Sequence, residues 1–296
     1  MHKKVVIFGE MLWDCFSDKN IPGGAPMNVA LHIQYLGYDT TFISKVGKDQ
    51  LGIDLLDFVQ SKSLDIGMIQ KDESHETSRV VVDDSDKENI KYEIVKPVAW
   101  DFISWNQEVQ KRVNEADAFV FGSLAARSKE SSETLLKLLE THTLKILDIN
   151  IRAPHYSFDL IESLLMKADI LKINDDELMI LKEELELSND IEKAITTLAQ
   201  NYKLKLVCVT LGSKGAMIYD GKQLHRHPGY KVIVEDTVGS GDAFLSGFIH
   251  QFLQNKPANE ILDFACALGA LVATNKGGTP QYDLKSIDNI RKSYSS

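Results

Sequence analysis

Short runs of β-branched residues alternate along this chain with longer stretches of helical periodicity. The predicted strands cover residues 4–8, 40–46, 118–121, 145–150, 168–174 and 205–210. The predicted helices cover residues 28–36, 49–60, 131–140, 161–166 and 191–200. Strands that alternate with helices pair mostly in parallel and are covered on both faces. The sequence therefore predicts an α/β fold with a mostly parallel central sheet and helices on both of its faces.

One stretch departs from this alternation. Residues 77–98 form two strand-like runs around a polar turn, SDKEN at 85–89, which predicts a β-hairpin without a helix of its own. A small β structure that emerges from an α/β body is well placed to act as a lid over a ligand; a surface hairpin without a role in binding is the alternative. We see no repeat or linker, so we expect a single domain, 1–296, that carries this small β lid, with residues near 12–20 as further candidates for it.

Charge and cysteine content disfavour some partners and locations. The chain has 33 Lys and Arg against 43 Asp and Glu, without a basic block, so a nucleic-acid partner is disfavoured. The three cysteines, Cys15, Cys208 and Cys266, form no CxxC pair, which suits a reducing cytosol. The most apolar later stretch, 261–273, contains Asp263 and is too short to span a membrane. We therefore expect a soluble, cytoplasmic protein with no membrane partner.

A glycine-rich turn precedes a helical pattern near the C-terminus. Residues 236–242 read DTVGSGD, and apolar residues at amphipathic spacing follow them. The backbone N–H groups of Gly239, Ser240 and Gly241 would then face an anion at a helix N-terminus. Asp242 would stand beside that anion, where a carboxylate can take the proton of an attacking hydroxyl. From these residues alone, an ordinary helix cap after a turn is the alternative.

A second glycine cluster lies near the N-terminus, where a segment beginning at Ile21 reads IPGGAPMNVA. Gly23 and Gly24 would let the backbone approach a ligand closely, and Asn28 supplies both a donor and an acceptor. Upstream, Asp14 follows the first predicted strand. Carboxylate and amide groups of this kind bind the vicinal hydroxyls of sugars. A loop followed by an ordinary cap is the alternative.

Four motifs together resemble those of the ribokinase-like (PfkB-type) carbohydrate kinases. GGAPMNVA at 23–30 and DTVGSGDAF at 236–244 are similar to the two signatures of this family. NDDE at 174–177 is similar to its NxxE motif, and TLGSKG at 210–215 to the end of its nucleotide-binding strand. The motifs follow the family's order over nearly the full length, and the hairpin falls where members carry their lid. The resemblance implies a ribokinase-like fold and transfer of the γ-phosphoryl group of ATP to a sugar hydroxyl.

The resemblance also implies roles for single residues. Asp242 would be the catalytic base, and the turn that precedes it, Gly239, Ser240 and Gly241, would be the anion hole for the phosphates. The residues that would bind the sugar are Asp14, Gly23, Gly24 and Asn28.

On the nucleotide side, the resemblance implies ATP, Mg²⁺ and K⁺ as cofactors. The residues that would lie along the nucleotide are Asn174, Glu177, Thr210, Gly212 and Gly215. Glu177 would hold Mg²⁺ through water, because this ion keeps several of its own waters. A monovalent-cation site is known in parts of the family, and carbonyl groups near Asp236, Val238 and Gly277 are the matching positions.

Three local features resemble the bacterial fructokinases within this family, namely GEMLWD at 9–14, PVAWD at 97–101 and DINIR at 148–152. Arg152 would reach a substrate oxygen, with a surface ion pair as the alternative. Trp100 would close over an apolar sugar face, with a packed aromatic as the alternative. We therefore expect fructose as the substrate. A kinase for another sugar or sugar acid, such as ribose or 2-keto-3-deoxygluconate, is an alternative, and a non-catalytic sugar- or nucleotide-binding regulator is a second.

Two further patterns give weaker evidence of function. His225 and His227 lie on one side of a predicted strand, but they lack a third ligand at usable spacing, so we interpret them as a structural or exposed pair. Lys214 lies between glycines without the spacing of a P-loop, so we expect a solvated turn residue. Lid hairpins with exposed edges pair between subunits, which leads us to expect a homodimer through the lid.

Overall fold

A large sheet runs through the described part of the chain, residues 3–83 and 91–292 of this computed structural model. Its strands are β1 (Lys4–Phe8), β4 (Asp39–Gly47), β5 (Ile69–Asp72), β8 (Ala118–Phe121), β9 (Leu144–Asp148), β10 (Ile170–Asn174), β11 (Leu206–Thr210), β12 (Ala216–Tyr219) and β13 (Leu224–His227). They lie in the order β13-β12-β11-β10-β9-β8-β1-β4-β5. All neighbours from β11 to β5 pair in parallel, whereas β12 and β13 are antiparallel additions at one edge. The predicted, mostly parallel sheet is confirmed.

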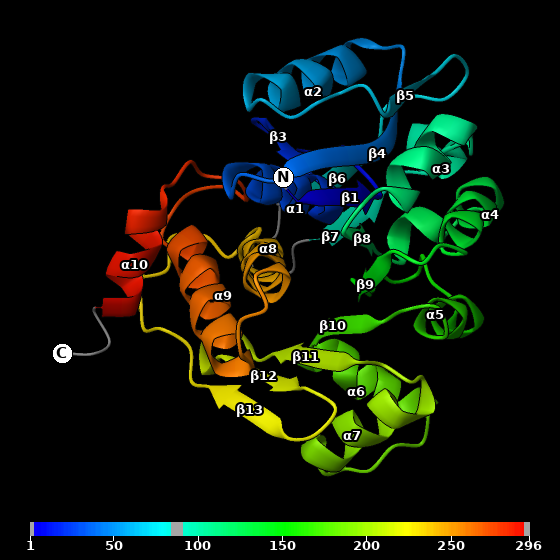
Figure 1. Cartoon of the computed structure of the whole chain (residues 1–296). Helices are drawn as coiled ribbons and strands as arrows, with labels where there is room; N and C mark the ends of the chain where they lie inside the picture. The colour runs from blue at the N-terminus through cyan, green and yellow to red at the C-terminus, as the bar shows by residue number, and fades with distance from the viewer. Residues whose placement is uncertain (1–2, 84–90, 293–296) are drawn as a thin grey trace.

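Helices cover both faces of this sheet, because successive strand side chains point to opposite sides. On β1, Val5 and Ile7 join one apolar cluster, and Val6 and Phe8 join the other. The first cluster includes α1 (Ala25–Tyr35), α2 (Gln50–Ser61), α8 (Ser240–Leu253) and α9 (Ala258–Ala273). The second includes α3 (Gln107–Asn114), α4 (Lys129–Leu138), α5 (Phe158–Leu165), α6 (Asp175–Glu184) and α7 (Ile191–Asn201). Figure 1 shows α10 (Leu284–Lys292) beside α9, outside these layers.

A helix that crosses a membrane needs about 20 predominantly apolar residues. Within residues 3–83 and 91–292, none is both long enough and apolar enough to cross a bilayer. The most apolar later stretch of the sequence, 261–273, lies inside α9, where its side chains pack against α8.

A small second sheet stands apart from the large one. Its strands are β2 (Leu12–Cys15), β3 (Asn20–Gly23), β6 (Arg79–Asp83) and β7 (Lys91–Ile94), in the order β3-β2-β6-β7. The hairpin segment 77–98 thus supplies β6 and β7, which pair antiparallel, while the segment near 12–20 supplies β2 and the start of β3. The SDKEN turn at 85–89 lies outside the described residues. Because β2 follows β1 and β3 leads into α1, the small sheet is attached at the C-terminal end of β1.

The carboxyl ends of the parallel strands all lie along one side of the large sheet, perpendicular to the strands. Helices α1, α6 and α8 begin at this same side, α6 directly after β10. Open α/β sheets bind ligands outside the carboxyl ends of their strands, where helix N-termini and loop side chains converge. The fold therefore brings the sequence motifs, which are spread over the whole chain, to one place.

Candidate active site

The two glycine-rich segments meet through a single side-chain bond. Asn28 on α1 donates its Nδ2–H to Oδ2 of Asp242 on α8 at 2.8 Å, across 214 residues of sequence. Both residues belong to the first turns of helices that begin after a glycine, Gly24 or Gly239. The bond therefore joins the N-terminal ends of α1 and α8 and brings the predicted sugar side and phosphate side together.

The turn before α8 is built around a close backbone contact. Gly239 has a left-handed φ of 73°, and a Cβ on it would lie 2.4 Å from the carbonyl oxygen of Gly278. Only glycine fits such a position without displacing the neighbouring backbone. Ser240 Oγ donates to the Gly269 carbonyl at 2.9 Å, which ties the start of α8 to α9. The Ser240 N–H donates to the Thr237 carbonyl at 3.2 Å. The other N–H groups at the start of α8 have no acceptor within the helix and favour an anion.

The Asp242 carboxylate has a raised proton affinity. Removal from water raises the pKa of Asp242 to about 6. The hydrogen bond from Asn28 and the positive charges of Lys172 and Arg152 act against this shift, and the charge of Asp148 adds to it. A base with a pKa near 6 is ionised at neutral pH but still accepts a proton readily, as general base catalysis requires.

A buried ion pair lies behind the turn. Lys172 on β10 places its Nζ 3.0 and 3.1 Å from the two carboxylate oxygens of Asp148 on β9. Only 7% of Lys172 is exposed. Burial acts against its charge, but the carboxylates of Asp148 and Glu177 hold the pKa of Lys172 above its ordinary value. The ammonium lies 3.7 Å from the point that a Cβ on Gly241 would occupy, so a fixed positive charge stands beside the turn.

Sequence reasoning missed this pair, although a signal for it was present. In the run ILKIN, Lys172 is the one charged residue of an otherwise apolar strand in a buried sheet. A lysine at such a position needs a carboxylate on a neighbouring strand, because an isolated buried charge is strongly unfavourable. Asp148, at the end of the adjacent strand, is that partner.

The NDDE motif forms the hydrogen-bonded N-terminus of α6. Asn174 Oδ1 accepts from the Glu177 backbone N–H at 2.8 Å, and Glu177 Oε2 accepts from the Asn174 N–H at 2.9 Å, which is a capping box. Glu177 Oε1 accepts from the Ile151 N–H at 2.9 Å. Burial raises the pKa of Glu177, and the charge of Lys172 acts against that shift. Each Glu177 oxygen keeps a further lone pair, which suits a water-mediated contact to a hard cation.

Four of the residues predicted to bind a sugar lie together at the start of α1, namely Asp14, Gly23, Gly24 and Asn28. A Cβ on Gly23 would lie 2.6 Å from Asp14 Oδ2, so the absence of a side chain there makes room for this carboxylate. A Cβ on Gly24 would lie 2.7 Å from the Glu10 carbonyl oxygen. Burial raises the pKa of Asp14, and Arg152 acts against it. Arg152 is exposed, and its charge also acts on Glu10 and Asp242, so it lies within electrostatic reach of all three carboxyl groups.

Trp100 lies elsewhere than expected. The structure buries it fully in the apolar cluster on the α3–α7 face, and the Arg127 guanidinium lies 4.0 Å from its ring centroid. Arg127 is held there by Asp101, with Nε–Oδ1 at 2.7 Å and Nη2–Oδ2 at 2.8 Å. The expectation that Trp100 covers a sugar face is corrected by this placement, because core side chains and the guanidinium occupy its surroundings.

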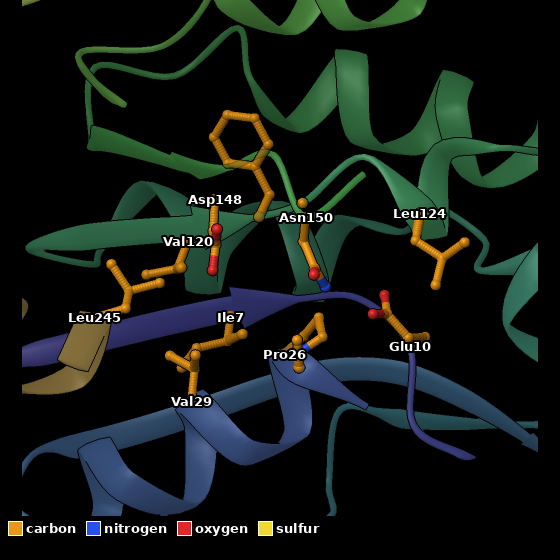
Figure 2. Close-up of a pocket in the computed structure, with 12 residues that line it drawn as sticks. Ile7, Glu10, Pro26, Val29, Val120, Leu124, Asp148, Asn150 and Leu245 are labelled. Carbon is orange, nitrogen blue, oxygen red and sulfur yellow. The ribbon is translucent and has the colours of Figure 1, made fainter. Parts of the chain in front are cut away.

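Glu10 is a second residue that the sequence analysis did not single out. It lines a cavity of ≈ 20 Å³, room for about one water molecule, together with Asp148 and Asn150. Figure 2 shows Glu10 entering from the segment after β1, near Pro26 of α1. Its Oε2 has no hydrogen-bond partner among the described residues, and burial raises its pKa to about 7. An acid directly after a buried strand, as in GEMLWD, was the available signal.

The predicted nucleotide residues lie at the ends of β10 and β11. Thr210 pairs in register with Asn174, and its Oγ1 contacts the Ile173 carbonyl at 3.4 Å. Gly212 faces open space, with nothing within 4 Å of a Cβ built on it. Gly215 differs, because a Cβ there would lie 1.9 Å from the His227 carbonyl oxygen. The packing between β12 and β13 thus explains Gly215 without a ligand.

The three predicted positions for a monovalent cation lie together. Asp236 Oδ1 accepts from the Val238 N–H and Oδ2 from the Gly277 N–H, each at 3.0 Å.

The two histidines of the predicted pair have separate partners, since His225 contacts Asp220 at 2.8 Å and His227 contacts Asp263 at 3.6 Å. Within the described ranges, three or more His, Cys, Asp or Glu side chains never gather as metal ligands.

The chain is similar to known carbohydrate kinases in sequence and in fold. The family model described as "pfkB family carbohydrate kinase" matches residues 3–284. The Arabidopsis thaliana protein "Probable fructokinase-5" is 31% identical, over 93% of this chain and 93% of its own length. The fructokinase of Xylella fastidiosa solved with ATP has a TM-score of 0.85 at 22% identity, covering 100% of both chains. A Vibrio cholerae fructokinase double mutant solved with fructose, ADP and potassium has a TM-score of 0.82 at 23% identity, covering 98% of both. These structures confirm the ribokinase-like fold.

The ion pair between Lys172 and Asp148 yields a prediction. Lys172→Met should lower the free energy of unfolding by about 3–5 kcal/mol, because it leaves a buried carboxylate without its partner. The double variant Lys172→Met/Asp148→Leu should recover much of that loss, since both charges are then replaced by apolar groups. Chemical denaturation of both variants measures the difference. Equal stability of the single variant and the unmodified protein would contradict a strongly coupled buried pair.

Proposed function

The chain belongs to the pfkB family of carbohydrate kinases, and from this we propose that it transfers the γ-phosphoryl group of ATP to a hydroxyl of fructose. Membership makes it a phosphotransferase with an alcohol group as acceptor. The bond of 2.8 Å between Asn28 and Asp242 carries the proposal. It supports a cleft in which one carboxylate lies between a sugar-binding helix start and an anion-binding helix start.

Asp242 acts as the base in the proposed reaction. It takes the proton of the sugar hydroxyl as that oxygen bonds to the γ-phosphorus, the bond to the bridging oxygen breaks, and ADP leaves. The N–H groups of Gly239, Ser240 and Gly241 hold the phosphate oxygens, and Lys172 adds a fixed positive charge behind them. Proton abstraction of this kind contributes roughly 10²–10⁴-fold to the rate. Positioning and electrostatics supply most of the remainder.

ATP lies along the ends of β10 and β11 in this proposal. Asn174, Thr210 and Gly212 border it, and Gly212 has open space around it. Glu177 would hold Mg²⁺ through water, which fits the free lone pairs of its two backbone-bonded oxygens. When bound, Mg²⁺ neutralises charge on the phosphates. The small sheet closes over both substrates and excludes water, which would otherwise compete with the sugar hydroxyl.

Charge supports a neutral sugar over a sugar acid. Asp14, Asn28, Gly23 and Gly24 border the proposed sugar site, and the carboxyl groups of Glu10, Asp14 and Asp242 all lie within reach of Arg152. A substrate carboxylate would be repelled by these acids unless Arg152 bound it directly. The positive charge of Arg152, which could bind a substrate carboxylate, favours the second candidate, a kinase for an acid such as 2-keto-3-deoxygluconate.

Cofactor, assembly and location complete the proposal. We place K⁺ at the loop of Asp236, Val238 and Gly277, as supported by the potassium in the Vibrio cholerae structure.

A second copy of the chain pairs with the open face of the small sheet, where Val81 is 45% exposed. Sedimentation velocity would detect the dimer. Three free cysteines support a reducing cytoplasm.

A substrate panel tests the function. With ATP, kcat/KM should be highest for fructose among fructose, glucose, ribose and 2-keto-3-deoxygluconate in a coupled ADP assay. Asp242→Asn should lower fructose-dependent ADP formation by about 10²–10⁴-fold while ATP binding persists, because only the base is lost. Asp57→Asn, an exposed acid on α2, is the matched control and should retain activity. A preference for 2-keto-3-deoxygluconate would establish the alternative kinase, and sugar binding without ADP formation would establish a regulator.

The raised pKa of Asp242 predicts the pH dependence. The carboxylate is the active form, so kcat/KM for fructose should be level well above pH 6 and fall about tenfold per pH unit below it. Glu10, whose pKa is raised to about 7, titrates nearby, so Glu10→Gln is the control and should keep the limb near pH 6. A rate that stays level down to pH 5, or a limb that disappears in Glu10→Gln, would contradict Asp242 as the base.

The cation loop yields a separate prediction. Replacing K⁺ by a bulky organic cation in the buffer should lower kcat, because the loop at Gly277 borders the turn before α8 through Gly278. Asp236→Asn weakens the loop's bonds to Val238 and Gly277 and should reduce the response to K⁺. Steady-state rates over a K⁺ titration measure both effects. Identical rates with and without K⁺ would remove the cation from the proposal.

A further inference from the structure

A fully buried histidine lies on α1 one turn after Asn28. His32 places Nε2 2.9 Å from the Gly278 carbonyl oxygen and Nδ1 3.0 Å from the Tyr282 hydroxyl. Its ring stacks on that of Tyr282, with centroids 5.6 Å apart and planes at 23°. Residues four apart share one face of a helix, so Asn28 and His32 both face the segment between α9 and α10. Figure 1 shows this segment passing beside α1.

The chemistry of these partners determines how the ring bonds. A carbonyl oxygen can only accept, so Nε2 carries the hydrogen and donates to Gly278. Nδ1 is then the acceptor, and the Tyr282 hydroxyl donates to it. Burial lowers the pKa of His32 to about 4, although the hydrogen bond to Gly278 by itself would raise it. The ring is therefore neutral at physiological pH. The neutral ring therefore satisfies one donor and one acceptor at once.

Gly278 contacts three groups, namely His32, the turn at Gly239 and Asn28. Its carbonyl oxygen lies 2.4 Å from the point that a Cβ on Gly239 would occupy, so the Gly278 backbone packs directly against the left-handed turn before α8. A Cβ on Gly278 itself would lie 3.0 Å from Asn28 Nδ2, the atom that donates to Asp242. His32 thus holds a backbone group that borders both the phosphate turn and the sugar-side asparagine.

We propose that His32 is a positioning residue, which holds the Gly278 carbonyl, and through it the Gly239–Gly241 turn, in the geometry that phosphoryl transfer needs. His32 is fully buried, so it acts through its neighbours and not by direct contact with a substrate. The link is backbone contact, because a displaced Gly278 carbonyl leaves the Gly239 turn without its support. The inference rests on the proposed function only for its effect on rate; the link between His32 and the turn is independent of activity.

Two substitutions separate this role from packing. His32→Leu fills the site with an apolar group and removes the donor to Gly278. His32→Gln also loses the ring, but its amide N–H extends to about the position of Nε2 and can still donate. His32→Leu should lower kcat about tenfold or more, with the KM for fructose changed less than about threefold, because misplaced groups act mainly on the transition state. His32→Gln should retain kcat within about threefold of the unmodified protein.

A second measurement does not depend on turnover. Hydrogen–deuterium exchange of the amides in 276–282 and 239–242 should quicken in His32→Leu and stay near the original rate in His32→Gln. Equal kcat and equal exchange in the two variants would overturn the proposal, because packing alone affects both. If His32→Leu does not fold, Tyr282→Phe replaces it: faster exchange at 276–282 supports the proposal, and unchanged exchange overturns it. Absence of kinase activity in the unmodified protein would instead overturn the proposed function and leave the exchange result to be judged separately.

Discussion

The bond between Asn28 and Asp242 is the contact on which the rest of the site depends. It closes a separation of 214 residues and joins two helices that each begin at a glycine with positive φ. Helix N-termini favour negative charge, so two of them directed at one place would favour an anion there. Asp242 supplies a negative charge to this region, and its shared hydrogen bond keeps that charge in a defined position. The large sheet makes this meeting possible because α1 and α8 pack on the same face.

Charge balance is the second constraint. Asp148, Glu177 and Asp242 all act on the buried Lys172, and Glu10 and Asp14 lie within reach of Arg152. Removal from water would by itself push Glu10, Asp14, Glu177 and Asp242 toward neutrality, and the two cations oppose this. The result is that Glu10 and Asp242, with pKa values raised to about 7 and about 6, lie in one region. In the proposed reaction, such a spread lets Asp242 accept a proton while the buried Lys172 stays charged.

The fold was largely predictable from hydrophobic periodicity, and the missed parts have specific causes. Strands β1 and β8 match their predicted residues, while β9 ends at Asp148, two residues early, before Asn150 adopts a positive φ. The short strands β2 and β3 were expected only as possible additions to a lid, because four residues carry little periodic signal. In the site, Lys172 and Glu10 were missed because a single charged residue in or after an apolar strand does not reveal its partner. Trp100 was misplaced because an aromatic near a hairpin has the same local pattern whether it packs inside or faces a ligand.

By itself, the sequence determined the alternation of strand and helix, the two glycine turns before helices, and the acids and amides beside them. These are local properties, since side-chain period and glycine's backbone freedom act within a few residues. Only the tertiary structure decided that Asn28 reaches Asp242, that Lys172 pairs with Asp148 behind the turn, and that His32 holds Gly278. Each of these is a contact between distant segments, whose distance depends on strand order and helix packing. No local pattern carries that information, because it is set when the two faces of the sheet are covered.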